Sequence, residues 1–351
     1  MDRRRIGTSA VEVSLLGFGG NALGNLYTQI DETEARDAVR AAYETGVSYF
    51  DTAPMYGHGL SERRIGDVLR SLPRDEIVLS TKVGRLLVPY GRTPPPRPTP
   101  RQGGIFTAEL PFLPTFDFSY DATMRSFEDS LQRLGMNRVD ILLIHDCDEW
   151  SHGPRYEDVL REVESGALKA LVRLREESVI EAIGAGVNQA ETCERLMDMG
   201  PFDCFMLAGR YTLLEQDSLD GFMSRVIGTG VSVLLAAPFN SGILVTGARP
   251  EAHYDYLPPP ADILDRVRRI ERVCASHAIP LPAAALQFVL AHPAVATVVP
   301  GSRSRGEAVQ NAEWAQLPIP AGFWRDLKAA GLVRGDAPTP GNDPRLAQPA
   351  V

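Results

Sequence analysis

The chain has 351 residues, of which 44% are hydrophobic and 23% charged, a balance typical of a globular protein with a large core. Its formal net charge of −9 argues against nonspecific binding to nucleic acid, because phosphates attract a basic surface. There is no apolar run of about 18 residues or more, so we expect no membrane-spanning segment.

The N-terminal residues are basic, but no apolar segment follows Arg5, so we expect no signal peptide. A hairpin is expected within residues 1–14, with Arg4–Ile6 and Val11–Val13 as its strands. This hairpin would plug the floor of the barrel predicted below. The four cysteines lack Cys-x-x-Cys spacing, which indicates reduced thiols and a cytoplasmic protein.

Eight short apolar runs, rich in Val, Ile and Leu, recur along the chain. They are Leu15–Phe18, Val47–Phe50, Ile77–Ser80, Val139–Ile144, Ile180–Gly184, Cys204–Leu207, Val231–Ala236 and Val295–Val299. Helical periodicity appears between them over Glu32–Tyr43, Glu62–Leu69, Ala122–Leu134, Tyr156–Glu177, Ala190–Met199, Leu219–Ile227, Ile263–His277 and Ala283–Ala291. Continuous apolar runs indicate strands buried on both faces, as in parallel sheets. Eight such units favour one α/β domain, a single (β/α)8 TIM barrel over residues 1–334, rather than a doubly wound sheet.

Two regions lie outside this repeat. Residues 83–118 show no clear helix or strand, and six of the twelve residues from Pro89 to Pro100 are proline. Proline fixes φ and removes a backbone donor, so we expect an extended loop there, either a surface insertion or a loop that covers the substrate. Residues 335–351 are rich in Pro, Gly and Asp, and we expect a flexible tail.

Polar side chains lie at the ends of three consecutive predicted strands. Asp51 ends the second strand, shortly before Tyr56, Lys82 ends the third, and His145 ends the fourth. A buried Asp or Lys is costly without a partner, so adjacent strands would pair Asp51 with Lys82. Any one of these residues has an ordinary explanation as a buried ion pair or a core histidine. Three of them at the rim where barrels carry their active sites favour catalysis.

The residue types indicate proton transfer to a carbonyl or from an alcohol. An ordinary phenol has a pKa of about 10, and a Lys82 cation held by Asp51 would lower the pKa of Tyr56. Tyr56 would then act as general acid or base while a hydride moves to or from nicotinamide, and His145 would orient the substrate oxygen. The six histidines lack paired ligand spacing, so we expect no metal site.

The segments Phe50–Gly57, Thr81–Gly84 and Ile144–Asp146 resemble the signature of the aldo-keto reductase superfamily, and the likeness extends over about residues 5–311. The resemblance implies an NAD(P)-dependent oxidoreductase in which Asp51, Tyr56, Lys82 and His145 are the catalytic residues. More specific segments resemble its D-threo-aldose 1-dehydrogenase branch, which includes L-fucose, L-galactose and pyridoxal 4-dehydrogenases. These segments are Ala208–Leu214, Pro238–Leu244 and Arg125–Gly135.

Two segments are candidates for the dinucleotide. Gly17–Ala22 fits the Gly-x-Gly-x-x-Ala fingerprint, but helix signals are delayed until Asp31, so we interpret this segment as the loop after the first strand. In barrels a phosphate site usually follows the last strands, and Pro300–Asn311 offers free amides, serines and arginines there.

The resemblance assigns cofactor contacts to particular residues. Asn188 would hold the nicotinamide amide, Phe239 to Leu244 would pass over the pyrophosphate, and Gln310 and Asn311 would meet adenine. The full predicted set is Asn188, Phe239, Ser241, Gly242, Leu244, Gly301, Ser302, Arg303, Glu307, Gln310 and Asn311. Where the resemblance leads us to expect an aromatic residue and a glutamine near nicotinamide, this chain has Ala236 and Ala208.

Cofactor choice is predicted from two further departures. Many NADPH-using relatives carry Lys at the position of Gly301 and Arg at that of Glu307. Gly301 removes one positive charge and Glu307 reverses another, so binding of the 2′-phosphate of NADP is disfavoured. A carboxylate can instead accept a hydrogen bond from the ribose 2′-hydroxyl of NAD, so we predict a preference for NAD over NADP. Arg303 and Arg305 are the residues that would oppose this preference.

By resemblance, the substrate is a cyclic hemiacetal whose C–H gives up a hydride and leaves a lactone. We expect a small sugar of the L-fucose or L-galactose type, with pyridoxal or a general aldehyde or ketone as alternatives. The polar residues Asp146, Asp148, Glu149, Trp150 and His152 would bind sugar hydroxyls or form an ordinary surface loop. Two other classes stay open, a lysine Schiff-base aldolase and a non-catalytic regulatory subunit.

Overall fold

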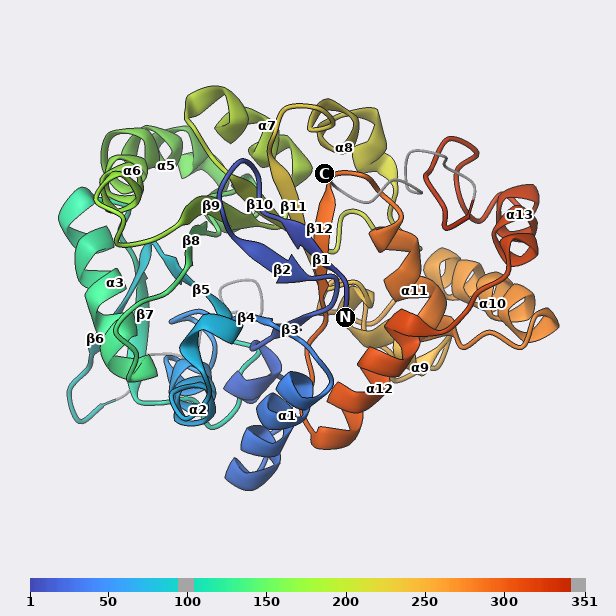
Figure 1. The fold of residues 1–351 in the computed structure, drawn as a ribbon, viewed down its shortest axis with the longest axis horizontal. Helices are drawn as coiled ribbons and strands as arrows, with labels where there is room; N and C mark the ends of the chain where they lie inside the picture. Colours follow the sequence, from blue (N-terminus) through green and yellow to red (C-terminus); the bar gives the residue numbers. More distant parts are fainter. Residues whose placement is uncertain (94–103, 342–351) are drawn as a thin grey trace.

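The computed structural model describes residues 1–93 and 104–341. At its centre, eight parallel strands form a barrel with helices outside it (Figure 1). The strands follow chain order around the sheet: β3 (Gly17–Gly19), β4 (Tyr49–Asp51), β5 (Val78–Val83), β8 (Ile141–His145), β9 (Ala182–Val187), β10 (Cys204–Ala208), β11 (Ser232–Ala236) and β12 (Val295–Val299). This confirms the barrel predicted from the repeat of apolar runs.

The barrel closes where the last strand returns to the first. Parallel bridges join Leu16 to Val298 and Gly19 to Gly301, and the amide of Gly19 donates to the carbonyl of Pro300 at 2.9 Å. A Cβ on Gly19 would lie 3.1 Å from that carbonyl oxygen, so the close approach favours glycine.

The helices form the outer layer. They are α1 (Glu32–Glu44), α2 (Leu60–Leu69), α3 (Tyr120–Leu134), α4 (Glu149–His152), α5 (Tyr156–Glu162), α6 (Leu168–Glu176), α7 (Ala190–Met199), α8 (Phe222–Arg225), α9 (Ile243–Thr246), α10 (Ala261–Ser276), α11 (Leu281–Leu290), α12 (Arg305–Gln316) and α13 (Ala321–Ala329). Side chains at the starts of several helices cap free amides; the Asp31 carboxylate, for example, accepts from the Thr33 amide at 2.7 Å before α1. The predicted helix Tyr156–Glu177 is present as α5 and α6, joined by a π-helical turn over Val163–Ala167.

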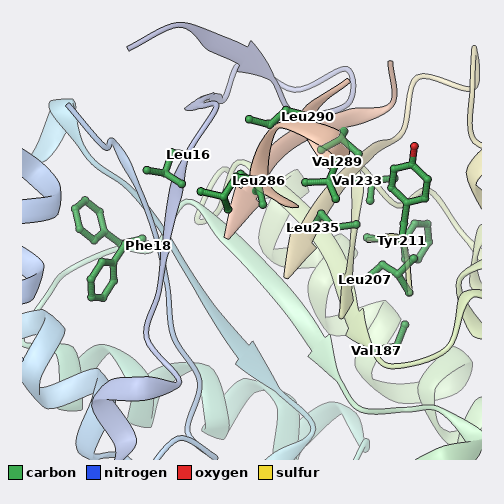
Figure 2. Packing of buried hydrophobic residues seen from close by; sticks show 14 of the residues in the cluster. Leu16, Phe18, Val187, Leu207, Tyr211, Val233, Leu235, Leu286, Val289 and Leu290 are labelled. Atoms are coloured by element: carbon green, nitrogen blue, oxygen red, sulfur yellow. The ribbon is translucent and has the colours of Figure 1, made fainter. Parts of the chain in front are cut away.

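One hydrophobic cluster fills the space between the strands and the helices. Figure 2 shows part of it, including Val233 and Leu235 of β11 and Leu286 and Val289 of α11. Burial of such side chains supplies most of the driving force for this packing, about 25 cal/mol for each Å² of apolar surface removed from water.

The N-terminal hairpin closes the floor of the barrel, as predicted. Its strands β1 (Arg3–Arg5) and β2 (Glu12–Ser14) pair antiparallel and cross the barrel in Figure 1. Ile6, Val11 and Val13 are buried together with barrel residues such as Tyr49 and Ile141. This second cluster seals the end of the barrel opposite the carboxyl ends of the strands.

Two predictions about secondary structure were wrong. Residues 83–118 contain an antiparallel pair, β6 (Arg85–Pro89) with β7 (Phe112–Phe116), which sequence reading missed because the partner strands are short and distant in the chain. The Pro-rich residues 94–103 lie outside the described range. The helix expected at Leu219–Ile227 is reduced to the short α8, because Gly221 adopts a non-helical backbone just before it.

Three further expectations concern parts of the chain outside the barrel. Among the described residues, no single helix is long and apolar enough to cross a membrane; α10 and α11 pass that test only as a pair bent by 98°. All four cysteines are buried and unpaired. Ala337 and Thr339 of the predicted tail are buried, and residues 342–351 lie outside the described range.

Candidate active site

Lys82 connects three of the four predicted catalytic residues through direct hydrogen bonds. Its ammonium donates to Asp51 Oδ2 at 2.6 Å, to the Thr52 carbonyl at 2.9 Å and to the Tyr56 hydroxyl at 3.1 Å. Lys82 and Asp51 are only 1% and 2% exposed. An ammonium has three protons, so these three acceptors satisfy it fully and hold it against the phenol.

The strand register explains this geometry. Asp51 pairs with Ser80 across β4 and β5, and the Ser80 hydroxyl donates to Asp51 Oδ1 at 2.7 Å. Lys82 lies two residues further along β5 and therefore points to the same side as Ser80. Gly186 on β9 leaves room for the lysine, since a Cβ there would lie 3.3 Å from Lys82 Cε.

The expectation that the pKa of Tyr56 is lowered was wrong for the protein without a bound cofactor. Burial raises the pKa of the Tyr56 phenol well above its ordinary value, and Asp51 and Asp146 raise it further, whereas Arg85 lowers it. The Asp51 carboxylate, 2.6 Å from the Lys82 ammonium, offsets the positive charge that would otherwise lower this pKa. Tyr56 is therefore a protonated acid at neutral pH.

His145 ends β8 and lies beside the tyrosine. The two rings meet edge to face, with their centroids 5.9 Å apart. Burial lowers the pKa of His145 well below its ordinary value, and the neighbouring Lys82 and Arg85 lower it further. The imidazole is therefore neutral, and the structure brings all four predicted catalytic residues together around one pocket.

The pocket opens at the carboxyl ends of the barrel strands, with about 1040 Å³ of empty space including its mouth. Ile105 and Phe106, from the region 83–118 outside the barrel repeat, form part of the pocket wall. The amide of Tyr27 donates to the Ile105 carbonyl and that of Thr107 to the Asn25 carbonyl, both at 3.0 Å. Phe106 thereby lies with its ring centroid 6.1 Å from that of Tyr56. Of the two interpretations of the insertion, this placement supports a loop that covers the substrate.

Only some of the polar loop residues after β8 face the pocket. Asp146 and Trp150 line it. Asp148 is fully buried, where it caps α4 through the Ser151 amide at 3.0 Å and accepts from the Asn188 amide at 2.7 Å. His152 is bonded through Nε2 to the backbone oxygen of Asp146 at 2.9 Å. These two residues therefore support the loop, while Asp146 and Trp150 remain placed for a substrate.

Six small residues from several strand ends are among those that line the pocket, and they leave space for a flat ring. They are Gly19, Gly186, Ala208, Ala236, Ala237 and Gly301. Asn188 lies beside them, and its side-chain nitrogen donates to Asp146 Oδ1 and Asp148 Oδ2, both at 3.1 Å. A Cβ on Gly301 would lie 2.7 Å from Asn21 Oδ1, so a larger residue here would require the Asn21 side chain to move. Small side chains beside the Asn188 amide would fit the flat nicotinamide end of an NAD(P) group, which would supply a hydride donor or acceptor there.

The predicted phosphate segment leads from β12 into α12. Ser302 and Asn311 are buried and bonded to each other at 3.0 Å, whereas Gln310 is exposed. Arg303 is paired with Glu307. Its backbone amide, Nε and Nη2 donate to the Glu307 carboxylate at 2.7 to 3.0 Å. Arg305 pairs with Glu44 of α1 at 3.0 Å. Both arginines therefore already have carboxylate partners.

The remaining predicted cofactor residues lie in the loop after β11. Phe239 packs edge to face on Trp314, with ring centroids 6.5 Å apart. Gly242 has a φ of 102°, a Cβ there would meet no atom within 4 Å, and Ser241 adopts a φ of 59°. Leu244 is fully buried in the main core and its amide donates to the Phe239 carbonyl at 3.2 Å, so the structure does not place it in contact with the pocket.

Sequence reading missed several pocket residues, namely Asn21, Met55, Arg85, Ile105, Phe106 and Tyr256. Most come from loops whose path depends on long-range contacts. Arg85 carried a signal, because it is a cation only three residues beyond Lys82 at the same strand end.

Comparisons with known proteins agree with this geometry. A model of the Aldo/keto reductase family matches residues 15–331. The chain is 39% identical over 337 residues to pyridoxal 4-dehydrogenase from Microbacterium luteolum, covering 95% of this chain and 98% of that protein. It is 37% identical over 338 residues to D-threo-aldose 1-dehydrogenase from a Pseudomonas species, covering 95% and 97%. The holo structure of aldo-keto reductase AKR11C1 from Bacillus halodurans superposes with a TM-score of 0.71 at 25% identity, covering 94% of this chain and 96% of that one.

Proposed function

This chain belongs to the Aldo/keto reductase family, an NAD(P)-dependent family of oxidoreductases, and from that premise we propose that it oxidises the hemiacetal carbon of a small aldose to a lactone. The Asp51–Lys82–Tyr56 hydrogen-bond chain at the bottom of the pocket carries this proposal. Pyridoxal is the second candidate substrate, because the relative named for it is 39% identical over nearly the whole chain.

In this proposal Tyr56 removes the proton from the hemiacetal hydroxyl as the carbon is oxidised. Lys82 stabilises the phenolate that this proton transfer requires, and Asp51 holds Lys82 in position. The neutral His145 orients the substrate oxygen without adding a charge. When bound, the nicotinamide supplies the hydride acceptor. In the reverse direction the protonated Tyr56 serves as the acid for a carbonyl substrate.

The geometry argues against the two other classes. A Schiff-base lysine needs a neutral, accessible amine, but Lys82 is buried and donates to three acceptors. A non-catalytic subunit would not require an acid, a cation, a carboxylate and an imidazole around one pocket. These observations favour an enzyme that transfers a proton and a hydride.

The substrate is tested by following NADH formation with L-fucose, D-arabinose, L-galactose and pyridoxal. We expect turnover of at least one sugar, with kcat/KM at least about tenfold above that for pyridoxal. A preference for pyridoxal would replace the sugar by the second candidate. If none of the four compounds leads to NADH formation while simple ketones are reduced, the proposed oxidation of hemiacetals is refuted.

We also propose that NAD is preferred over NADP. The support lies at the predicted phosphate segment, where Glu307 presents a carboxylate and occupies Arg303. A 2′-phosphate there would meet repulsion and would have to compete for the arginine.

Replacing Glu307 by Gln should release Arg303 and raise the ratio of kcat/KM for NADP to that for NAD by about tenfold, equivalent to about 1.4 kcal/mol. Glu177→Gln is the matched control, since it releases Arg173 from a similar exposed i,i+4 pair that lies outside the predicted phosphate segment, and it should leave the ratio unchanged. A wild-type enzyme that favours NADP would refute the proposed preference.

A further inference from the structure

Arg85 is a buried cation in the pocket wall that the proposed proton transfer does not use. It is 4% exposed and lines the same pocket as Tyr56 and His145. It lies at the start of β6, where Gly84 has a φ of 95° and a Cβ would lie 2.5 Å from the ring of Phe118. This turn, which favours glycine, directs the chain from the barrel into the β6–β7 pair and places the arginine at the mouth.

The guanidinium of Arg85 is held in a defined orientation. Its Nη2 donates to Asp146 Oδ2 at 2.6 Å, and its carbon lies 3.9 Å from the ring centroid of Phe116. Asp146 is itself fixed, because its Oδ1 accepts from Asn188 at 3.1 Å and its backbone adopts a strained φ of 48°. Strain of this kind is typical of functional sites, where surrounding contacts enforce it.

The hydrogen-bonding capacity of Arg85 is only partly used. A guanidinium has five N–H donors. Among the described residues, Asp146 takes one strong bond, the sulfur of Met55 takes a weak one at 3.5 Å, and Nε has no partner. Unfilled donors on a buried cation are costly, so an oxygen atom entering the pocket would be bound there.

The charges around the pocket define the class of ligand. The charged residues lining its described part are Asp51, Lys82, Arg85 and Asp146, two of each sign. An anionic substrate would therefore find no uncompensated cation. An N–H donor beside a carboxylate acceptor instead matches a neutral hydroxyl, which accepts from one group and donates to the other.

We propose that Arg85 and Asp146 together bind one ring hydroxyl of a neutral sugar, away from the reacting carbon, and so determine which sugar is oxidised. This inference rests on the proposed function and identifies the ring hydroxyl by which the pocket would distinguish one sugar from another. A substrate held at this second point has a fixed ring orientation relative to Tyr56, which aligns its C–H for hydride loss.

The test compares L-galactose with its monodeoxy analogues in wild type and in Arg85→Met. Wild type should lose about 10- to 100-fold in kcat/KM when the contacted hydroxyl is removed, as expected for a hydrogen bond to a charged group. Arg85→Met should lose a similar factor in kcat/KM on L-galactose and should treat that one analogue and the parent alike. Arg85→Lys keeps the charge but not the planar fork, so it should recover the activity only in part.

Arg175→Met is the matched control, because Arg175 also pairs with an aspartate, Asp203 at 2.7 Å, but outside the pocket. It should leave the pattern of preference among the analogues unchanged. If the losses from Arg85→Met and from every hydroxyl removal simply multiply, Arg85 has a structural role and the inference fails while the proposed function stands. If wild type oxidises L-fucose or D-arabinose but neither L-galactose nor its analogues, the inference fails; if it oxidises none of these sugars, the proposed function itself fails.

Discussion

Replacing Tyr56 by Phe is expected to lower kcat by about 1,000-fold, within the range typical for loss of a general acid or base. The substitution removes one oxygen, the acceptor of the 3.1 Å hydrogen bond from Lys82, and leaves the ring in its place beside His145. Substrate and cofactor should still bind, so KM should change little. The measurement is steady-state kinetics of sugar oxidation and of carbonyl reduction.

Tyr211→Phe is the matched control, because Tyr211 is also buried and its hydroxyl has no hydrogen-bond partner in the described part of the chain. That variant should retain nearly all activity. A Tyr56→Phe enzyme with more than about a tenth of wild-type kcat would show that another group moves the proton.

The raised pKa of Tyr56 adds a pH dependence to this result. Oxidation needs the deprotonated phenol, and burial raises the pKa of that phenol above its ordinary value. The rate of oxidation by wild type should therefore rise as pH increases from neutrality toward the alkaline range. Carbonyl reduction uses the protonated phenol and should lack this rise. The alkaline rise should disappear in Tyr56→Phe.

Replacing Lys82 by Met is expected to abolish measurable activity and to destabilise the fold by about 3 to 5 kcal/mol. The reason is that Asp51, 2% exposed and paired at 2.6 Å, would keep a buried charge without its partner. Burial already raises the pKa of Asp51, while Lys82 and Ser80 favour its charged form. Urea denaturation and kcat measured on the same samples separate the two effects.

The double variant Lys82→Met with Asp51→Asn distinguishes stability from catalysis. Removing both charges should recover much of the lost stability, because no unpaired charge remains buried, but it should recover no activity. Arg36→Met serves as the control, since Arg36 pairs with Asp67 at the surface, where it is 52% exposed. Its loss should cost less than about 1 kcal/mol. If the double variant is as unstable as Lys82→Met alone, uncompensated charge is not the cause.

Much of the fold could be predicted because it follows from local patterns. The eight apolar runs gave eight strands, since a strand buried on both faces needs continuous apolar residues. The β6–β7 pair was missed because Arg85–Pro89 is short and acquires its strand geometry only from pairing with Phe112–Phe116. Pairing between distant segments leaves little trace in the sequence of either one.

The sequence alone determined that the four candidate catalytic residues meet at one rim of the barrel. Asp51, Lys82 and His145 end neighbouring parallel strands, and the carboxyl ends of such strands must lie at the same rim. Only the tertiary structure decided the electrostatic state and the walls of that site. The pKa of Tyr56, the position of Arg85 against Asp146 and the placement of Phe106 depend on distances between segments far apart in the chain. The positions of the strands along the chain follow from local hydrophobicity. Electrostatic interactions and packing depend instead on separations of a few ångströms that only the folded chain defines.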